Sequence, residues 1–477
     1  MKACADMERT GVPLDVETLR FLQNHWDDVR RDLAGDSLSE YDIFDDLHFS
    51  HDKFEVFLKA EGLNKAWPRT EKSKARRLDK ETWEEMVALN PELEYLRQLY
   101  KTVTMPGLNV ACDPDGHSRV LLGAFGTITS RNAPGSDRER GTFVFAPAKW
   151  VRFLIKPRAG RALAYLDWSN QEFGIAAVLS GDKNMLRAYE AGDPYLALAI
   201  LCGAAPVGAT KKSHREVRNL YKSATLAIGY GQTEWGFAKK TKVDAATARR
   251  VFQNYRRTYS TYIAWREKQV DDYGISLKLS TRLGWTLHHG QRIKPNTILN
   301  FGAQANAAEM LRLAIIEMRR RGVEVCCPIH DAVLIQSPVA EIDSAVAEAQ
   351  AAMSAASAAM LNGYVLRCDC TDDAVGASGE IIRGDITRYP QRFHAEDGKD
   401  MWNRVQCALD KVQSTIKTAG TSLLDRTDDE NSATENERMD ERLDSRMESY
   451  LEYMSARPEV ALKECLQNSS PMRPIAC

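Results

Sequence analysis

Two short apolar runs, each carrying an aspartate, constrain the fold of this chain more than any other feature of its sequence. The run Leu163 to Leu166 leads directly into Asp167, and the segment Pro328-Ile-His-Asp-Ala-Val-Leu-Ile335 holds His330 and Asp331 between two apolar halves. Runs of this length are typical of buried strands, and the second predicts a hairpin that turns near His330. Each aspartate would then stand at the end of a rigid strand, although a charged hairpin tip by itself is often only solvated.

Taken together, Asp167 and Asp331 permit a specific chemistry. Two carboxylates can hold two Mg²⁺ ions roughly 3.5–4 Å apart, one lowering the pKa of an attacking hydroxyl and the other stabilising the leaving phosphates. Phosphoryl transfer needs little more from a protein than this positioning and charge. The pair is therefore a candidate phosphoryl-transfer site.

A third feature is a stripe of side chains at four-residue spacing. Arg218, Lys222, Leu226 and Tyr230 would share one face of a helix, because each residue turns the helix by about 100°. Two cations at one end and apolar and aromatic groups at the other suit a nucleoside triphosphate. The spacing equally fits an amphipathic helix with its cations in water. The glycines on both sides of Tyr230 indicate a close approach or a hinge.

Helical spacing of apolar residues is common elsewhere in the chain. It predicts helices at 16–33, 81–103, 171–191, 215–230, 245–273, 299–320 and 343–361, and strand structure at 280–287 and 364–370. After about residue 418 the chain is polar and rich in acids, and we assign no chemistry to this tail.

The net charge of −2 does not exclude a nucleic-acid partner. Residues 418–477 hold 13 acidic and 7 basic side chains, which leaves 53 acidic and 57 basic ones in the rest of the 477-residue chain. Only a local groove has to attract phosphate, so a modest overall charge is compatible with a basic one. Composition alone leaves the partner open.

Cysteine spacing and hydropathy bear on the compartment. No apolar stretch approaches the roughly 20 residues that span a bilayer, so no membrane association is expected. The ten cysteines lack the spacing of a secreted disulfide framework, which predicts reduced thiols in the cytoplasm. Cys326-Cys327 and Cys368-x-Cys370 lie in strand-like runs and are expected to be buried thiols rather than zinc ligands.

The three segments described first resemble the motifs of family A, polymerase I-like DNA polymerases. Asp167-Trp-Ser169-Asn-Gln-Glu172 is similar to motif A, D-x-S-x-x-E. Arg218-x3-Lys222-x7-Tyr230-Gly231 resembles motif B, and His330-Asp331 resembles motif C. Four further segments also resemble the family, and together they extend the likeness from about residue 5 to about residue 375: Met7 to Asp15, Thr129-Ser-Arg131, Gly192-Asp193-Pro-Tyr195 and Asn300-x3-Gln304. Several motifs in the right order are far more specific than any one of them.

The resemblance implies an α+β right-hand fold of palm, fingers and thumb with an antiparallel palm sheet. It implies a template-dependent DNA polymerase that binds primer–template DNA and dNTPs as a monomer, in DNA repair or replicon copying. The implied parts are an N-terminal segment and thumb at 1–104, palm at 105–192, fingers at 193–279, palm again at 280–380 and a C-terminal extension at 381–477. The chain begins where a proofreading domain would end, so we expect a short form without exonuclease domains.

The resemblance also assigns roles at the reaction centre. Asp167, Asp331 and the backbone carbonyl of Trp168 would hold two Mg²⁺ ions, with Mn²⁺ as a substitute. Arg218 and Lys222 would bind the triphosphate, and Lys222 would also donate a proton to pyrophosphate.

The sugar, base and DNA contacts follow from the same resemblance. Glu172 would be the steric gate against a ribose 2′-OH and would pack against Tyr230 beside the templating base. The residues expected on the DNA are Arg131, Asn300 and Gln304 along the minor groove and His330 at the primer terminus.

Four positions depart from the family pattern. The second carboxylate of motif C is Ala332, and an arginine after motif A is Gly174. Two nucleotide-binding positions are also changed, with Tyr195 in place of a histidine and Leu226 in place of an aromatic residue. These changes bear on efficiency and sugar selectivity rather than on the reaction class.

Three other interpretations remain open. A single-subunit RNA polymerase shares the fold but has a small residue at the position of Glu172. A catalytically weak or inactive DNA-binding scaffold would fit Ala332, but it has no use for the stripe on the helix 215–230. A repair variant with added lyase chemistry at a lysine has no residue pattern to test it.

Overall fold

The computed structural model describes residues 2–36, 41–135, 141–288, 293–369, 381–383 and 396–424. The chain divides into a first unit, Met1–Leu409, and a second, Asp410–Cys477. In the second unit the described residues form the end of α16 (Glu396–Leu424). Within the described ranges, no helix is both long enough and apolar enough to cross a bilayer.

The strands that carry the two aspartates pair directly with each other. β7 (Arg161–Trp168) lies between β11 (Ala332–Pro338) and β12 (Cys368–Asp369), and β10 (Glu324–Ile329) completes the order β10-β11-β7-β12. β13 (Ile381–Arg383) also pairs with β7, and all these pairs are antiparallel. Both faces of β7 and β11 are buried along nearly their whole length, which explains their continuous apolar sequence.

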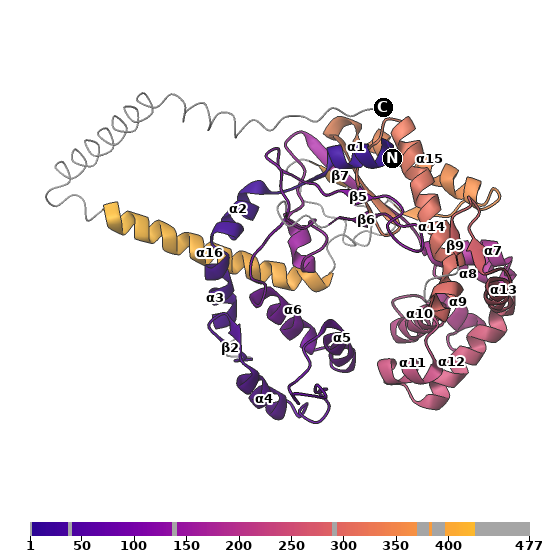
Figure 1. The fold of residues 1–477 in the computed structure, drawn as a ribbon, viewed down its shortest axis with the longest axis horizontal. Helices are drawn as coiled ribbons and strands as arrows, with labels where there is room; N and C mark the ends of the chain where they lie inside the picture. The colour runs from indigo at the N-terminus through magenta and orange to yellow at the C-terminus, as the bar shows by residue number, and fades with distance from the viewer. Residues whose placement is uncertain are drawn as a thin grey trace, which may run out of the picture. The chain divides into compact units, whose positions relative to one another are not determined.

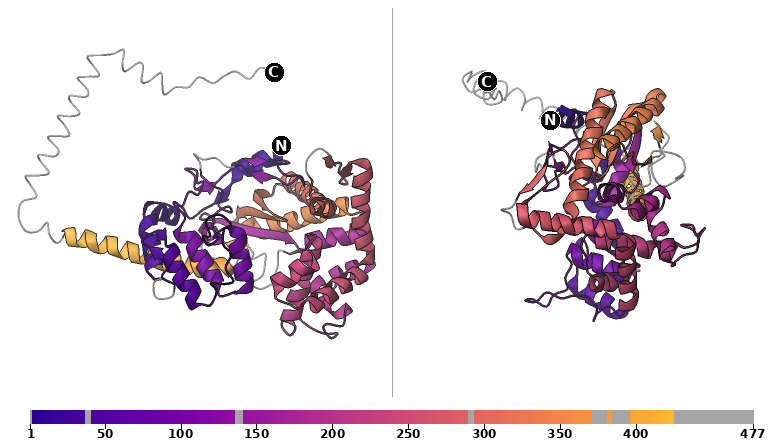
Figure 2. Two further views of the ribbon diagram at one scale, coloured as in Figure 1. Left: turned by 60° about the horizontal axis from the view of Figure 1, so that its bottom comes forward. Right: turned by 90° about the vertical axis from the view of Figure 1, so that its right-hand side faces the viewer.

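Two long helices support this sheet, and Figure 2 shows them together. α15 (Ile342–Met360) packs against β7 and β11, and α14 (Pro295–Arg320) packs along α15. α15 is rich in alanine, with Ala349 and Ala352 fully buried, so the helix can approach its neighbours closely. The prediction of helices at 299–320 and 343–361 is confirmed.

A helical block follows β7. It consists of α7 (Gln171–Ser180), α8 (Lys183–Glu190), α9 (Pro194–Leu201), α10 (Arg215–Gly229), α11 (Glu234–Thr241), α12 (Ala245–Thr258) and α13 (Ser260–Ser276). The aspartates Asp182, Asp193 and Asp244 cap three of these helices by accepting backbone N–H groups, as N-cap side chains do. The helix expected at 171–191 is therefore two helices, which part at the left-handed Gly181. The one expected at 245–273 breaks at Tyr259.

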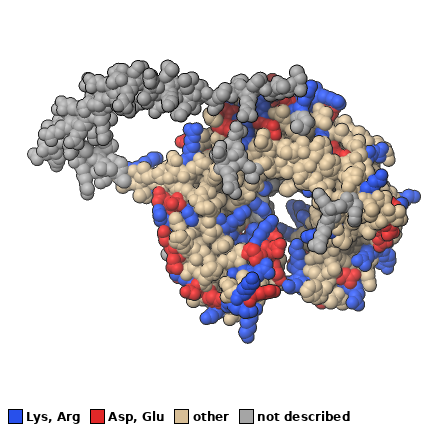
Figure 3. Space-filling view, viewed as in Figure 1, with Lys and Arg blue, Asp and Glu red and all other residues tan. Residues whose placement is uncertain are grey.

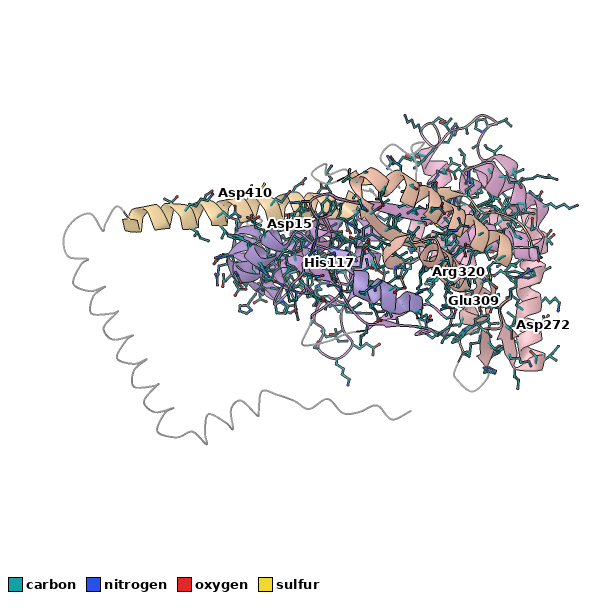
Figure 4. All side chains as sticks on the ribbon, turned by 90° about the horizontal axis from the view of Figure 1, so that it is seen from above. Asp15, His117, Asp272, Glu309, Arg320 and Asp410 are labelled. Atoms are coloured by element: carbon teal, nitrogen blue, oxygen red, sulfur yellow. The ribbon has the colours of Figure 1, made fainter. Side chains whose placement is uncertain are left out.

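The first hundred residues form a separate helical arm with an aromatic core. Its helices are α2 (Val16–Asn24), α3 (Trp26–Asp36), α4 (His51–Ala60), α5 (Lys80–Leu89) and α6 (Leu93–Val103), and α1 (Lys2–Thr10) precedes them (Figure 1). Phe54 is fully buried, stands edge-to-face with Trp67 and is tilted against Trp83. Asp15, labelled in Figure 4, caps α2 and pairs with Lys156 just before β7.

The remaining elements are short. They are β1 (Val12–Pro13), β2 (Phe44–Asp45), β3 (His48–Phe49), β4 (His117–Ser118), β5 (Leu122–Gly123), β6 (Ala133–Pro134), the 3-10 helices η2 (Lys149–Leu154) and η3 (Val339–Glu341), β8 (Lys278–Ser280) and β9 (Thr286–His288). The strand expected at 280–287 is thus a hairpin with a turn in its middle. Of the strand expected at 364–370, only residues 368 and 369 are extended in β12, and residue 370 lies outside the described ranges.

Candidate active site

The two aspartates lie side by side at one end of the sheet. Asp167 is the next-to-last residue of β7 and is 3% exposed. Ala332, the first residue of β11, stands directly opposite Asp167 in the strand register. Asp331 is the residue before Ala332, so the hairpin turn brings the second carboxylate next to the first. The strand pairing thus brings the two aspartates to the same end of the sheet.

The hairpin turn consists of His330 and Asp331, between the paired residues Ile329 and Ala332. His330 has φ of +60°, as the first position of a tight two-residue turn requires when the strands keep their twist. A residue other than glycine rarely adopts this conformation. Burial raises the pKa of Asp331, and the nearby carboxylate of Glu172 acts in the same direction.

Glu172 lies at the start of α7 and has two partners. Arg131 donates from Nη2 to Glu172 Oε1 over 3.0 Å, and the Tyr230 hydroxyl donates to Oε2 over 3.5 Å. Burial, followed by the charge of Glu172, raises the pKa of Tyr230, which keeps its hydroxyl protonated. The arrangement fixes Glu172 between the loop that carries Arg131 and the end of α10.

The cationic end of α10 is held by α9. Arg218 donates from Nε to Asp193 and lies over the ring of Tyr195, with 5.4 Å between the guanidinium carbon and the ring centre. Burial lowers the pKa of Lys222, and the neighbouring charge of Arg218 lowers it further. Burial raises the pKa of Tyr195 to about 12.

A cavity of about 450 Å³ lies among these elements. Ten of the expected site residues line it: Arg131, Trp168, Glu172, Tyr195, Leu226, Tyr230, Asn300, Gln304, His330 and Asp331. Asp167, Arg218 and Lys222 are not among its lining residues. The volume lies within the range usual for small-ligand sites.

Several residues at the site were not expected from the sequence. Asp193 belongs to the Gly192-Asp193-Pro-Tyr195 segment but was given no role there, and in the structure it accepts a hydrogen bond from Arg218. Gln171 and Thr225 line the cavity and are almost fully buried, and the Gln171 Nε2 and Thr225 Oγ1 atoms have no hydrogen-bond partner among the described residues. No spacing or charge pattern singles out either residue.

The geometry explains one of the family departures. A Cβ atom at Gly174 would stand 2.6 Å from Leu366 and 2.9 Å from the ring of Tyr189. Since these side chains fill the space beside α7, an arginine at position 174 does not fit in this chain. Ala332, which stands where the family has the second carboxylate of motif C, is fully buried opposite Asp167.

Comparisons with known proteins define the class of this fold. A solved structure, the POL domain of Pol1 from M. smegmatis in complex with DNA primer-template and dNTP, matches with a TM-score of 0.59 at 19% identity over 77% of this chain and 68% of that one. The right-hand polymerase fold and the α+β class are thereby confirmed. Residues 146–370 match the family model described as DNA polymerase family A.

Curated relatives agree with this assignment. The thermostable DNA polymerase I of Thermus thermophilus is 24% identical over 370 residues, which is 72% of this chain and 43% of that protein. The DNA polymerase of Mycobacterium phage D29 is 22% identical over 348 residues, 70% of this chain and 55% of that protein. The chain therefore spans about half the length of the relatives it matches.

Proposed function

We propose that the chain is a template-dependent DNA polymerase that adds dNTPs to a primer 3′-OH by two-metal-ion phosphoryl transfer. The observation that carries this proposal is the pairing of β7 with β11, which puts Asp167 and Asp331 together beside the cavity that contains Glu172 and Tyr230. The names of the relatives support it, since they are DNA polymerases.

The donor groups at the sheet end fit Mg²⁺. Two neighbouring, largely buried carboxylates repel each other, and a cation between Asp167 and Asp331 would offset that repulsion and their lost hydration. Among the described residues no group of three His, Cys, Asp or Glu side chains could hold a metal. The ligand set would be Asp167, Asp331 and the Trp168 carbonyl, and Mg²⁺ commonly binds to one or two carboxylates plus phosphate oxygens. When bound, two such ions would lower the pKa of the primer hydroxyl and neutralise charge on the phosphates.

The stripe on α10 supplies the nucleotide contacts of the proposal. Arg218 and Lys222 would bind the triphosphate, and Lys222, with its lowered pKa, would release its proton to the pyrophosphate oxygen more readily than an ordinary lysine. Leu226 and Tyr230 would contact the sugar and base, and Glu172 would exclude a 2′-OH.

The DNA contacts are assigned to other residues that line the same cavity. Asn300 and Gln304 stand one turn apart on α14, and Arg131 and His330 lie beside them. Acceptors on base edges occur in the minor groove of every base pair. These donors are therefore suited to binding DNA of any sequence. Figure 3 shows lysine and arginine side chains gathered beside a hollow in the face shown, as a phosphate backbone requires.

The proposal keeps the part boundaries expected from the sequence. They are an N-terminal segment and thumb at 1–104, palm at 105–192 and 280–380, fingers at 193–279 and a C-terminal extension at 381–477. The chain is also proposed to be a monomer, to be located in the cytoplasm and to act in DNA repair or replicon copying.

A primer-extension assay on templated DNA tests the proposal, with dNTPs and rNTPs supplied separately. We expect template-directed products with dNTPs and Mg²⁺ and few with rNTPs. Binding of primer–template without any extension would favour the scaffold alternative that Ala332 suggests. In a parallel reaction without dNTPs, we expect a mismatched primer to stay full length, since no proofreading is proposed for this chain.

A further inference from the structure

The helix α16 begins beyond residue 370, where the match to the polymerase family ends. Its first half is nevertheless packed into the first unit. Met401, Val405 and Ala408 are fully buried, and Leu409 is 8% exposed. Ordering a helix costs conformational entropy, and burial of its apolar face offsets that cost. The first half of α16 is therefore a packed part of the first unit.

Three tryptophans from distant parts of the chain form a continuous stack under α16. Trp402 stacks on Trp150 of η2, with 6.1 Å between ring centres and 18° between planes, and on Phe153 at 5.7 Å and 16°. Trp26 of α3 stacks on Trp150 at 5.9 Å and 25°. The stack therefore joins the helical arm, the 3-10 helix before β7 and α16.

Hydrogen bonds fix this stack to the arm. Trp150 Nε1 donates to Thr102 Oγ1 of α6 over 3.1 Å, and Trp26 Nε1 donates to the Met105 carbonyl over 2.9 Å. Buried indole N–H groups need such partners. The arm and η2 thus meet at a defined orientation.

α16 also contacts both partners separately. The guanidinium of Arg404 lies over the ring of Tyr95 on α6, with 3.9 Å to the ring centre. At Gly398 a Cβ atom would stand 3.1 Å from backbone atoms of Lys149 and Trp150, so the absence of a side chain there allows the close approach. α16 lies across the junction between α6 and η2.

The arm depends on this junction. The large core that joins the sheet to the helical block contains none of the buried residues of α2 to α6. η2 leads into β7, which carries Asp167. The contacts around η2 therefore tie the arm to the strand of Asp167, and a second contact joins α5 to α11 through the ion pair of Glu85 and Lys239.

We propose that α16 is a brace that holds the arm α2–α6 to the base of β7 and thereby sets how long primer–template DNA stays bound. Trp402 and Arg404 are positioning residues in this scheme, since they act through the arm. The inference rests on the proposed polymerase function. Loosening the brace should speed the release of DNA and leave the chemical step unchanged, because no residue of α16 lines the active-site cavity.

The test compares Trp402→Ala, Arg404→Leu and the conservative Trp402→Phe with the wild-type chain. Cys407→Ser is the matched control, because Cys407 is an exposed residue of the same helix. Losing one aromatic pair or one cation–π contact is expected to raise the DNA dissociation rate and to shorten the product made per binding event, each by about five- to tenfold. The rate of the first nucleotide addition in a single turnover should stay within about twofold, and Trp402→Phe should restore most of the loss.

Hydrogen–deuterium exchange in residues 93–103 supplies a readout that does not depend on activity. We expect faster exchange there in Trp402→Ala and Arg404→Leu, and no change in Cys407→Ser. The brace is refuted if both variants keep the wild-type dissociation rate, or if the single-turnover rate falls in the same proportion as product length. If the wild-type chain shows no extension at all, the polymerase proposal fails, and the exchange experiment still decides whether α16 holds the arm.

Discussion

Three residues of the active site have a left-handed backbone conformation that side chains usually avoid. They are Ser130 with φ of +61°, Asn170 with +51° and His330 with +60°. Each stands one or two residues before a side chain of the site, namely Arg131, Glu172 or Asp331. A sharp turn immediately before a functional group directs that group, and such strained residues cost about 1–3 kcal/mol each.

The backbone strain at Ser130 should be the easiest of the three to remove by substitution. Its side chain is fully buried, and its hydroxyl has no hydrogen-bond partner among the described residues. Ser130→Gly would relieve both the φ strain and the unpaired hydroxyl, so we expect the free energy of unfolding to rise by about 1–2 kcal/mol after the entropy cost of glycine. Ser130→Ala is the control, since it removes only the hydroxyl and should gain less. Chemical denaturation of the three proteins measures the difference, and a less stable glycine variant would contradict the argument.

The two aspartates give the sharpest single-residue prediction. Asp167→Asn and Asp331→Asn should each abolish primer extension while leaving primer–template affinity within about threefold, because the metals serve the transition state more than DNA binding. Asp272→Asn is a suitable control, since Asp272 is a surface residue of α13 paired with Lys268 (Figure 4). Near wild-type extension by either site variant would rule out the two-metal assignment.

At the level of elements, the sequence predicts helices and strands that have a regular pattern of apolar residues. It does not predict helix breaks or contacts between helices, which depend on tertiary structure. The four-residue stripe located α10, and the apolar runs located β7 and the β10–β11 hairpin, because burial on both faces leaves a continuous apolar pattern. The breaks at Gly181 and Tyr259 were missed, since helical spacing continues through both. The link between Asp193 and Arg218 could not be read from spacing, because a hydrogen bond between two helices leaves no periodic trace in either.

The contact between α7 and α10 leads to a prediction about sugar choice. Glu172 is fixed by Arg131 and Tyr230, so a 2′-OH beside it would clash or lose a hydrogen bond. Glu172→Ala should raise rNTP use relative to dNTP by about one to three orders of magnitude. Single-nucleotide kcat/KM values for both nucleotides measure this ratio. An unchanged ratio would show that Glu172 is not the gate.

The lysine on α10 predicts a pH effect. The pKa of Lys222 is lowered, chiefly by burial, so the protonated form that donates to pyrophosphate is lost at lower pH than for a free lysine. Extension should therefore decline on the alkaline side before pH reaches the ordinary lysine pKa of about 10.4. Lys222→Arg should be slower but should keep its rate to higher pH, because arginine remains protonated. Single-turnover rates across the alkaline range test both statements, and identical profiles would exclude Lys222 as the donor.

At the level of the whole molecule, net charge is a poor guide to the partner. The chain carries −2 overall, yet the proposed DNA contacts include Arg131 and the phosphate contacts include Arg218 and Lys222. What matters is the charge of the protein surface that faces the bound strand, and the net charge of the sequence does not report it.

Primer–template affinity should therefore depend strongly on salt. Displacement of counterions from several phosphates makes log K fall linearly with log salt, with a slope of about −0.9 per phosphate neutralised on duplex DNA. We expect a slope of about −3 or steeper when affinity is measured by fluorescence anisotropy between about 50 and 200 mM salt. Affinity independent of salt would argue against a phosphate-binding groove.

The tryptophan stack also has a consequence for the order of events during synthesis. Its members stand at positions 26, 150 and 402, so the contact has a very large sequence separation, and such contacts form slowly. The helices of the arm leave the ribosome early and can fold as a unit, but their attachment is completed only after Trp402 has been translated. A nascent chain should accordingly contain arm helices that already contact η2 but still lack α16, which would leave the Trp402-facing side of Trp150 exposed until the last part of the first unit arrives.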